Sequence, residues 1–239
     1  MSAGLGVVFD LDDTLYPARR FGLSGYAAVA RHVEARHGVP SREVFRDLAV
    51  ALRRGRFTDA FQACSTRHGL PPDATTTMLE VFRSHEPRLR LPRESAHVLL
   101  TCRRLARVGI LTNGLPAIQR RKVAALGLEP LVDAVIYAHE HAAEGKPAPA
   151  AFDAAHEALG RPARMLMVGD NLAFDVGGAL RAGWTPVWFT RWTATPCDDA
   201  PSHVIRIARL ADLLPLAENM GEEDRAEFIA RHSTAARRR

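Results

Sequence analysis

Short runs of apolar residues recur along the chain, separated by segments with helical periodicity. The apolar runs span 5–9, 108–111, 134–137, 165–168 and 186–189, with a weaker one at 203–207. Runs of this length, bounded by Gly, Asp or Asn, are typical of strands buried on both faces of a sheet. The helical segments between them span 94–107, 116–126, 148–159 and 173–182. This alternation predicts an α/β fold with a doubly wound parallel sheet.

The interval between the first and second predicted strands is far longer than a normal strand-to-helix connection. It contains helical patterns at 22–37, 42–54, 58–68 and 74–85 and no strand pattern. We therefore expect a smaller all-helical cap domain at residues 19–91. The catalytic core is expected at 1–18 and 92–220, followed by a C-terminal helix and basic tail at 221–239.

Composition narrows the class of protein. Three cysteines without metal-ligand spacing argue against a disulfide scaffold or a zinc site. The N-terminus lacks a signal-peptide pattern and no apolar run approaches a membrane span, so a soluble, cytoplasmic protein is expected. The net charge of +5 suits an anionic small substrate. The arginine-rich tail lacks interleaved aromatics, so we expect no nucleic-acid partner. We also expect no membrane partner, and either a monomer or a homodimer.

The strongest chemical signal follows the first predicted strand. Asp10 and Asp12 lie two residues apart, just beyond the strand's end, where ligands bind in open α/β sheets. Crowded carboxylates repel one another unless a cation neutralises them. Oxygen ligands of this kind favour Mg²⁺ when the substrate is a phosphate. The structural alternative is a solvated acidic turn.

Three further polar clusters follow later strands or precede helices. Thr112 and Asn113 offer a hydroxyl and backbone N–H groups to an anion, although a plain strand-to-helix turn also fits. Lys146, between Gly and Pro, is either a point charge for phosphate or an exposed loop lysine. Asp170 follows the fourth strand with Asp175 five residues on, and the alternative is that Asp170 caps a helix.

In this order, the four clusters resemble the motifs of the haloacid dehalogenase superfamily of phosphohydrolases. The resemblance covers about residues 5–190, and the position of the predicted cap resembles the family's helical cap type. The opening Phe-Asp-Leu-Asp-Asp-Thr-Leu-Tyr-Pro is also similar to the branch that contains pyrimidine 5′-nucleotidases.

The resemblance implies a Mg²⁺-dependent phosphomonoester hydrolase that forms an aspartyl phosphate. Asp10 would be the nucleophile, and Asp12 the acid and base. The side chains of Asp10 and Asp170 and the backbone carbonyl of Asp12 would bind Mg²⁺. The remaining site residues are expected around them: Thr112, Asn113 and Lys146 at the phosphoryl group, and Asp175 and Thr14 in support.

Other activities share this set of motifs. A phosphomutase would return the phosphoryl group to a sugar, and a 2-haloacid dehalogenase would use the same fold with an Asp nucleophile. A non-catalytic binding domain is a third alternative. The substrate is expected to be a small phosphorylated metabolite, with nucleoside monophosphates, sugar phosphates and phosphoglycolate all open.

Overall fold

A six-stranded parallel sheet forms the centre of the larger part of the molecule. The computed structural model describes residues 4–54, 59–192 and 204–220. The strands are β1 (Leu5–Phe9), β2 (Arg107–Thr112), β3 (Ala134–Tyr137), β4 (Arg164–Gly169), β5 (Thr185–Phe189) and β6 (Ile205–Ile207). Their order is β3-β2-β1-β4-β5-β6, and every neighbouring pair is parallel. The prediction of a doubly wound parallel sheet is confirmed.

The first strand lies in the middle of the sheet, between β2 and β4. Val7 pairs with Val108 on one side and with Leu166 on the other, and all three are buried. This double burial explains why the strands are continuous apolar runs and not alternating ones. Parallel strands end at the same edge, so the residues that follow β1, β2 and β4 are brought together.

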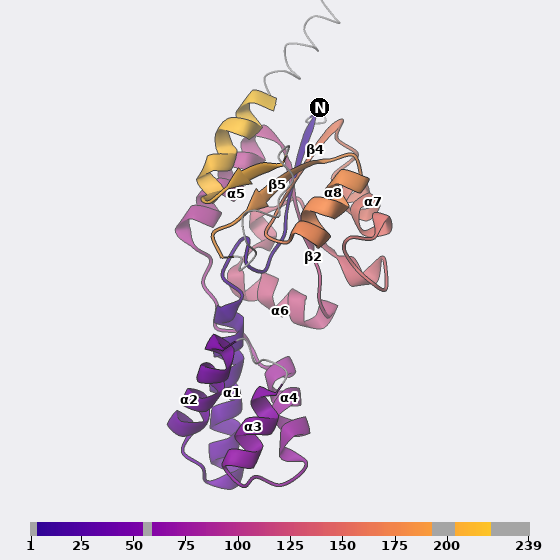
Figure 1. Cartoon of the computed structure of the whole chain (residues 1–239). Helices are drawn as coiled ribbons and strands as arrows, with labels where there is room; N and C mark the ends of the chain where they lie inside the picture. The colour runs from indigo at the N-terminus through magenta and orange to yellow at the C-terminus, as the bar shows by residue number, and fades with distance from the viewer. Residues whose placement is uncertain (1–3, 55–58, 193–203, 221–239) are drawn as a thin grey trace, which may run out of the picture. The chain divides into compact units, whose positions relative to one another are not determined.

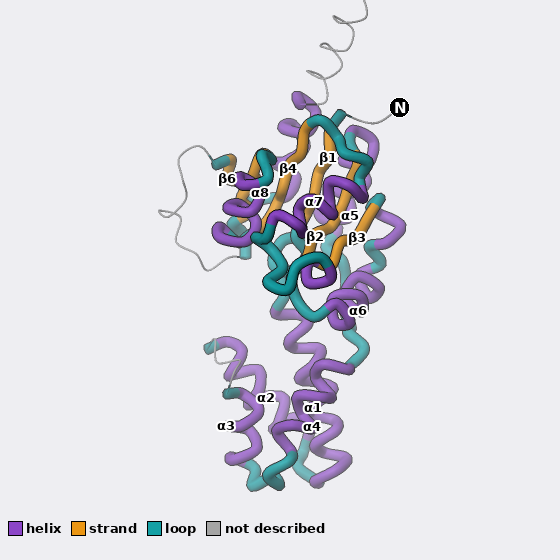
Figure 2. The backbone as a smooth tube through the Cα atoms, turned by 90° about the vertical axis from the view of Figure 1, so that its right-hand side faces the viewer, coloured by secondary structure: helices purple, strands orange, loops and turns teal. Residues whose placement is uncertain are grey.

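Helices cover both faces of the sheet (Figures 1 and 2). They are α5 (Arg93–Leu105), α6 (Pro116–Leu126), α7 (Pro149–Ala158) and α8 (Gly177–Arg181), with 3₁₀ turns at Glu129–Leu131, Ala138–Glu140 and Leu210–Leu213. On the α7 and α8 side, Phe152 and Ala179 pack in one buried cluster with Val8, Leu111 and Met167. This apolar layer fixes the strands from which the polar loops project.

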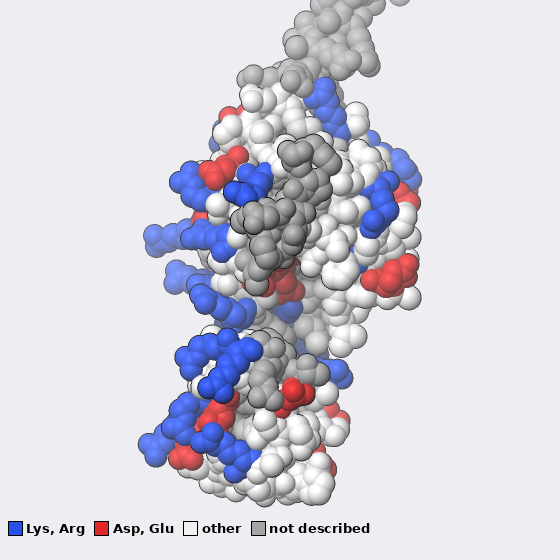
Figure 3. All heavy atoms as spheres, viewed as in Figure 1, with Lys and Arg blue, Asp and Glu red and all other residues white. Residues whose placement is uncertain are grey.

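A second compact unit is entirely helical. It comprises the described residues of 18–90 together with 120–126 and contains α1 (Arg19–His37), α2 (Ser41–Arg53), α3 (Ala60–Arg67) and α4 (Ala74–Ser84). Its own core includes Tyr26, Leu48 and Met78. Basic side chains gather on the α2 side of this unit (Figure 3). The expected cap at 19–91 overlaps the unit but does not include 120–126.

The C-terminal half of α6 belongs to this helical unit for identifiable reasons. Arg121 donates a hydrogen bond through Nη1 to the backbone oxygen of Arg83 at 2.5 Å. The Lys122 ammonium lies 4.6 Å from the centre of the Phe21 ring, a cation–π distance. A helix pattern read from sequence does not reveal that the two halves of one helix pack in different units.

The expected helix at 173–182 is two pieces. Residues Leu172–Val176 form a π-helical turn, and α8 starts only at Gly177. The wide turn shows in the bond from the N–H of Val176 to the oxygen of Asn171, five residues back. The predicted tail at 221–239 and the start of the predicted strand at 203 lie outside the described residues. None of the helices in the described ranges is long and apolar enough to cross a membrane.

Candidate active site

The predicted polar residues meet at the carboxyl edge of the sheet. Asp10 directly follows β1, Thr112 is the last residue of β2, and Asp170 directly follows β4. The N–H of Asp10 donates to the oxygen of Val168 at 2.8 Å, so the β1–β4 backbone pairing includes the residue that carries the carboxylate. The backbone of Asp10 is therefore fixed by the sheet.

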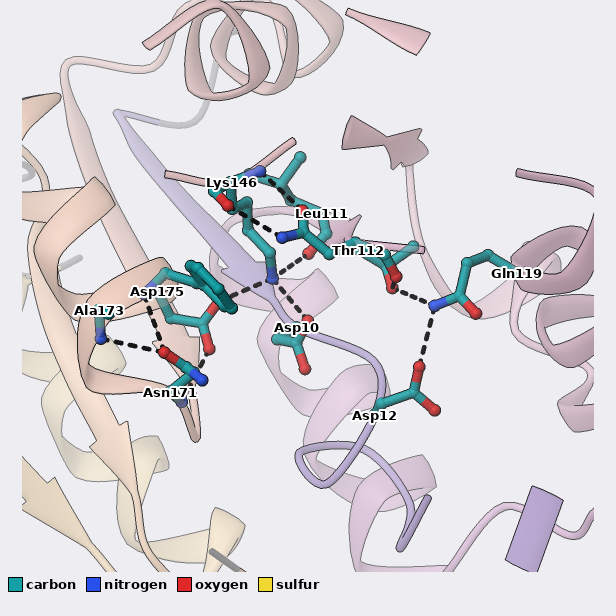
Figure 4. A network of polar contacts seen from close by, with 11 residues as sticks. Asp10, Asp12, Leu111, Thr112, Gln119, Lys146, Asn171, Ala173 and Asp175 are labelled. Atoms are coloured by element: carbon teal, nitrogen blue, oxygen red, sulfur yellow. Dashed lines mark hydrogen bonds and ion pairs between the residues drawn. The ribbon is translucent and has the colours of Figure 1, made fainter. Parts of the chain in front are cut away.

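Lys146 lies at the centre of this edge (Figure 4). Its Nζ donates to Oδ1 of Asp10 at 2.5 Å, to Oδ1 of Asp175 at 2.7 Å and to the backbone oxygen of Leu111 at 2.9 Å. All three hydrogens of the ammonium are thus used. The residue is only 2% exposed, so the alternative of a solvated loop lysine does not hold.

The side chain of Asn113 fixes the loop that carries this lysine. Its Oδ1 accepts from the N–H of Lys146 at 2.7 Å, and its Nδ2 donates to the backbone oxygen of Lys146 at 2.9 Å. The neighbouring Gly145 has φ +66°, and a Cβ there would lie 2.6 Å from Oδ1 of Asn113. The amide clamp therefore requires glycine at this position.

Three carboxylates crowd around the lysine. Oxygens of Asp10, Asp170 and Asp175 all lie within 4.8 Å of one another. Burial, together with the neighbouring carboxylates, raises the pKa of Asp10 to about 7 against the opposing effect of Lys146. Burial and the charges of Asp10 and Asp175 raise the pKa of Asp170 to about 8. One ammonium cannot neutralise three carboxylates, so the donor set fits a divalent cation with hard oxygen ligands.

The π-helical turn places Asp175 in this cluster. Asn171 caps the turn, because its Oδ1 accepts from the N–H groups of Ala173 at 3.0 Å and Phe174 at 2.9 Å. The N–H of Asn171 in turn donates to Oδ2 of Asp175 at 3.0 Å. The capping residue is thus Asn171, not Asp170. The backbone oxygen of Asp170 instead accepts from the indole N–H of Trp188 at 2.8 Å.

Asp12 lies apart from the three-carboxylate cluster and has its own donors. Its Oδ1 accepts from the hydroxyl of Tyr16 at 2.6 Å, and its Oδ2 accepts from Nε2 of Gln119 at 2.9 Å. Burial and the adjacent Asp12 charge raise the pKa of Tyr16, so the phenol remains a donor. Both carboxyl oxygens of Asp12 therefore accept hydrogen bonds from uncharged side chains. The environments of Asp10 and Asp12 therefore differ strongly.

Two residues complete the site. Gln119 is buried and also donates from Nε2 to Oγ1 of Thr112 at 2.6 Å. The sequence analysis did not identify it, because a single glutamine in the first turn of a helix carries no motif signal. Thr14 is fully buried, and its Oγ1 finds no hydrogen-bond partner among the residues that the structure describes.

Fold and site together define a class of protein: a doubly wound α/β protein with a buried cluster of carboxylates and one lysine at the carboxyl edge of its parallel sheet. The model of the haloacid dehalogenase-like hydrolases matches residues 5–183. The chain belongs to this family. Its curated relatives include a glyceraldehyde 3-phosphate phosphatase of Pyrococcus abyssi, 28% identical over 94% of this chain and 98% of the relative. The pyrimidine 5′-nucleotidase YjjG of Escherichia coli is 30% identical over 59% of this chain and 60% of its own length.

Solved structures similar to this chain include one named as a phosphatase and one named as a dehalogenase. A HAD phosphatase from Thermococcus onnurineus is 26% identical, covers 90% of this chain and 97% of its own, and has a TM-score of 0.58. A 2-haloacid dehalogenase from Pseudomonas syringae is also 26% identical, with coverage of 90% and 98% and a TM-score of 0.60. Since the two are equally similar, the site and not the fold must distinguish the reactions.

Proposed function

We propose that this protein is a Mg²⁺-dependent phosphatase of small phosphorylated metabolites that works through an aspartyl phosphate on Asp10. The observation behind the proposal is the contrast between two neighbouring carboxylates. Asp10 contacts Lys146 within a cluster of carboxylates, whereas Asp12 accepts hydrogen bonds from neutral donors. Two carboxylates in different environments suit a nucleophile and a separate acid and base.

Asp10 and Asp170 are the proposed side-chain ligands of the metal ion, together with the backbone carbonyl of Asp12. The support is the buried cluster of oxygens described above, which holds more negative charge than Lys146 neutralises. Bound Mg²⁺ would offset that charge and polarise a phosphoryl oxygen. Asp175 keeps its bond to Lys146 and so supports the site from outside the proposed ligand set.

In the first half-reaction, an oxygen of Asp10 forms a bond to phosphorus while the bond from phosphorus to the ester oxygen breaks. The departing oxygen takes up the proton of Asp12, which becomes a carboxylate. Thr112 and the backbone N–H of Asn113 hold phosphoryl oxygens, and Lys146 neutralises charge on the transferring group. These contacts supply positioning and electrostatic stabilisation, which dominate phosphoryl transfer.

In the second half-reaction, the oxygen of a water molecule bonds to phosphorus and the bond to Asp10 breaks. Asp12 accepts the proton of that water, inorganic phosphate departs, and both carboxyls return to their starting states. Thr14, on the loop after β1, supports the position of the two aspartates. The helical unit is proposed to act as the cap that excludes bulk water during these steps.

The presence of Asp12 distinguishes this proposal from dehalogenase chemistry. A halide leaving group needs no proton, so a dehalogenase has no use for an acid at this position. In this chain, Tyr16 and Gln119 both bind the Asp12 carboxyl, an arrangement that favours a working acid and base. We therefore place hydrolysis of a phosphomonoester ahead of dehalogenation.

The proposal is tested by measuring phosphate release from a panel of phosphomonoesters. The panel holds nucleoside monophosphates, sugar phosphates, phosphoglycolate, glyceraldehyde 3-phosphate and p-nitrophenyl phosphate, each with Mg²⁺ or with EDTA. We expect Mg²⁺-dependent turnover by the wild type and a loss of at least about 10³-fold in Asp10→Asn, because the amide is not a nucleophile. Unchanged turnover by a folded Asp10→Asn protein would contradict the proposal.

A further inference from the structure

The side chain of Gln119 takes no part in bond making or breaking in the proposed reaction, yet it donates hydrogen bonds to both Asp12 and Thr112. It lies on α6, is 1% exposed, and reaches both partners from the same nitrogen (Figure 4). The distances from Nε2 are 2.9 Å to Oδ2 of Asp12 and 2.6 Å to Oγ1 of Thr112.

The orientation of the amide follows from its partners. Whenever Asp12 is ionised, its oxygens can only accept hydrogen bonds, and the group facing Oδ2 is then the NH₂ of Gln119. The opposite orientation would place the amide oxygen against the carboxylate, with no hydrogen between them. An NH₂ group has two hydrogens, which allows one bond to Asp12 and one to Thr112.

The bond to Thr112 directs the hydroxyl hydrogen of that residue. Because Oγ1 accepts from Gln119, its own hydrogen must point away from the amide. That hydrogen is donated to the backbone oxygen of Asn113 at a long 3.3 Å. Such a weakly bound hydroxyl is ready to donate to a phosphoryl oxygen instead.

The bond to Asp12 completes the fixation of that carboxyl. Tyr16 donates to one carboxyl oxygen and Gln119 to the other, so rotation about the Cβ–Cγ bond would break both bonds.

We propose that Gln119 is a positioning residue that sets the acid and base Asp12 and the phosphate-binding Thr112 relative to each other. The inference rests on the proposed phosphatase function. Protonation of the leaving group requires the carboxyl and the bound phosphoryl group to be aligned, and one amide fixes both. Misplacement of a reacting group by about 1 Å can cost about 10²-fold in rate.

The test is Gln119→Met, which keeps the length of the side chain and removes both donors. Single-turnover phosphorylation is measured with an alkyl phosphate and with p-nitrophenyl phosphate, whose leaving group needs little help from an acid. We expect a loss of about 10²-fold with the alkyl phosphate and a clearly smaller loss with p-nitrophenyl phosphate. The exposed Gln62 on α3 provides the matched control, Gln62→Met, which should match the wild type with both substrates.

The same substitution is then made in an Asp12→Asn background. If Gln119 acts through Asp12, most of its effect on the alkyl phosphate disappears there, because the acid is already lost. An equal loss in both backgrounds, or an equal loss with both leaving groups, would mean a general structural role and overturn the inference.

A second variant, Gln119→Glu, distinguishes the loss of the hydrogen bonds from a general loss of folding. A glutamic acid donates one hydrogen bond when protonated and none when ionised, so its activity relative to Gln119→Met should rise as the pH falls. A constant ratio between the two variants would also overturn the inference. Failure of the wild type to release phosphate from any substrate would instead overturn the proposed function, and the inference with it.

Discussion

Burial and the charges of neighbouring side chains have opposing effects on the ionisation of Asp10. As the proposed nucleophile, Asp10 would have to be ionised to attack phosphorus, yet burial raises its pKa to about 7. Lys146 favours the ionised form through its 2.5 Å contact, and a bound divalent cation would do so more strongly. The neighbouring Asp170, with its pKa raised to about 8, adds to the cost of ionisation. Binding of the proposed cation and ionisation of the cluster should therefore be linked.

This linkage predicts an inverse effect of pH on the stability of the metal-free protein. Burial raises the pKa of Asp10 from an unperturbed 3.8 to about 7 and that of Asp170 from 3.8 to about 8. Between about pH 4 and 8 the folded state therefore holds more protons than the unfolded state, and the free energy of unfolding falls as the pH rises. With EDTA, we expect Tm to fall between about pH 5.5 and 8.5, less so in Asp170→Asn.

Added Mg²⁺ should reverse that trend. Metal ligands bind when deprotonated, so Mg²⁺ should raise Tm more at about pH 8.5 than at about pH 5.5. Thermal melts of wild type and Asp170→Asn, each with Mg²⁺ and with EDTA, measure both effects. An equal rise in Tm at both pH values, or a rise of the same size in Asp170→Asn, would contradict the assigned ligand set.

Among the secondary structure elements, the end of β4 and the π-helical turn after it must approach each other closely. Gly169 is the last residue of β4, and a Cβ at this position would overlap the carboxyl group of Asp175. The absence of a side chain at Gly169 lets Asp175 reach Lys146. Glycine is needed at the end of the strand because there is no room for a Cβ, and not because the backbone needs an unusual conformation.

We predict that Gly169→Ala lowers kcat by about 10²-fold, because the methyl group displaces Asp175 and with it the lysine contact. Gly177→Ala, at the start of α8, is the matched control. Its Cβ would meet nothing closer than the backbone oxygen of Leu172 at 3.4 Å, an ordinary contact. Steady-state kinetics and thermal melts of both variants provide the measurement. Similar kcat values for the two variants would show that the close approach of Gly169 and Asp175 does not affect catalysis.

The elements were largely predictable from the sequence, and their fine structure was not. The strand at 5–9 was identified with the observed bounds because it is a buried apolar run that ends at a carboxylate. The sequence predicts a regular α-helix where the structure has a π-helical turn. A local apolar pattern does not show whether each N–H bonds to the oxygen four or five residues back. The contact between Gln119 and Asp12 joins residues 107 positions apart, so it depends on how α6 packs and not on any local signal.

At the scale of the whole molecule, two compact units have separate cores. The sheet unit is organised around Val8 and its neighbours, and the helical unit around Tyr26, Leu48 and Met78. The sequence predicted a helical insertion from its length and its lack of strand patterns. It did not predict that residues 120–126, in the C-terminal part of α6, pack with that insertion. Such long-range packing is a tertiary property that local propensity cannot specify.

Family membership sets the fold of the whole chain but not its reaction. A solved phosphatase and a solved dehalogenase are equally similar to this chain in identity. What distinguishes the reactions is therefore the chemistry of the site, for which we propose phosphoryl transfer through Asp10 with Asp12 as acid and base. A dehalogenase, a phosphomutase and a binding domain make different predictions about a covalent phosphoryl group and its fate.

The most direct test is to trap that group in Asp12→Asn with p-nitrophenyl phosphate and Mg²⁺. This leaving group departs without an acid, whereas hydrolysis of the intermediate lacks its base, so the phosphorylated enzyme should accumulate. After an acid quench, peptide mass mapping should find a phosphoryl group on Asp10, and Asp10→Asn should show none. Release of nitrophenol with no phosphoryl group on Asp10, or with one on another residue, would contradict the proposed chemistry.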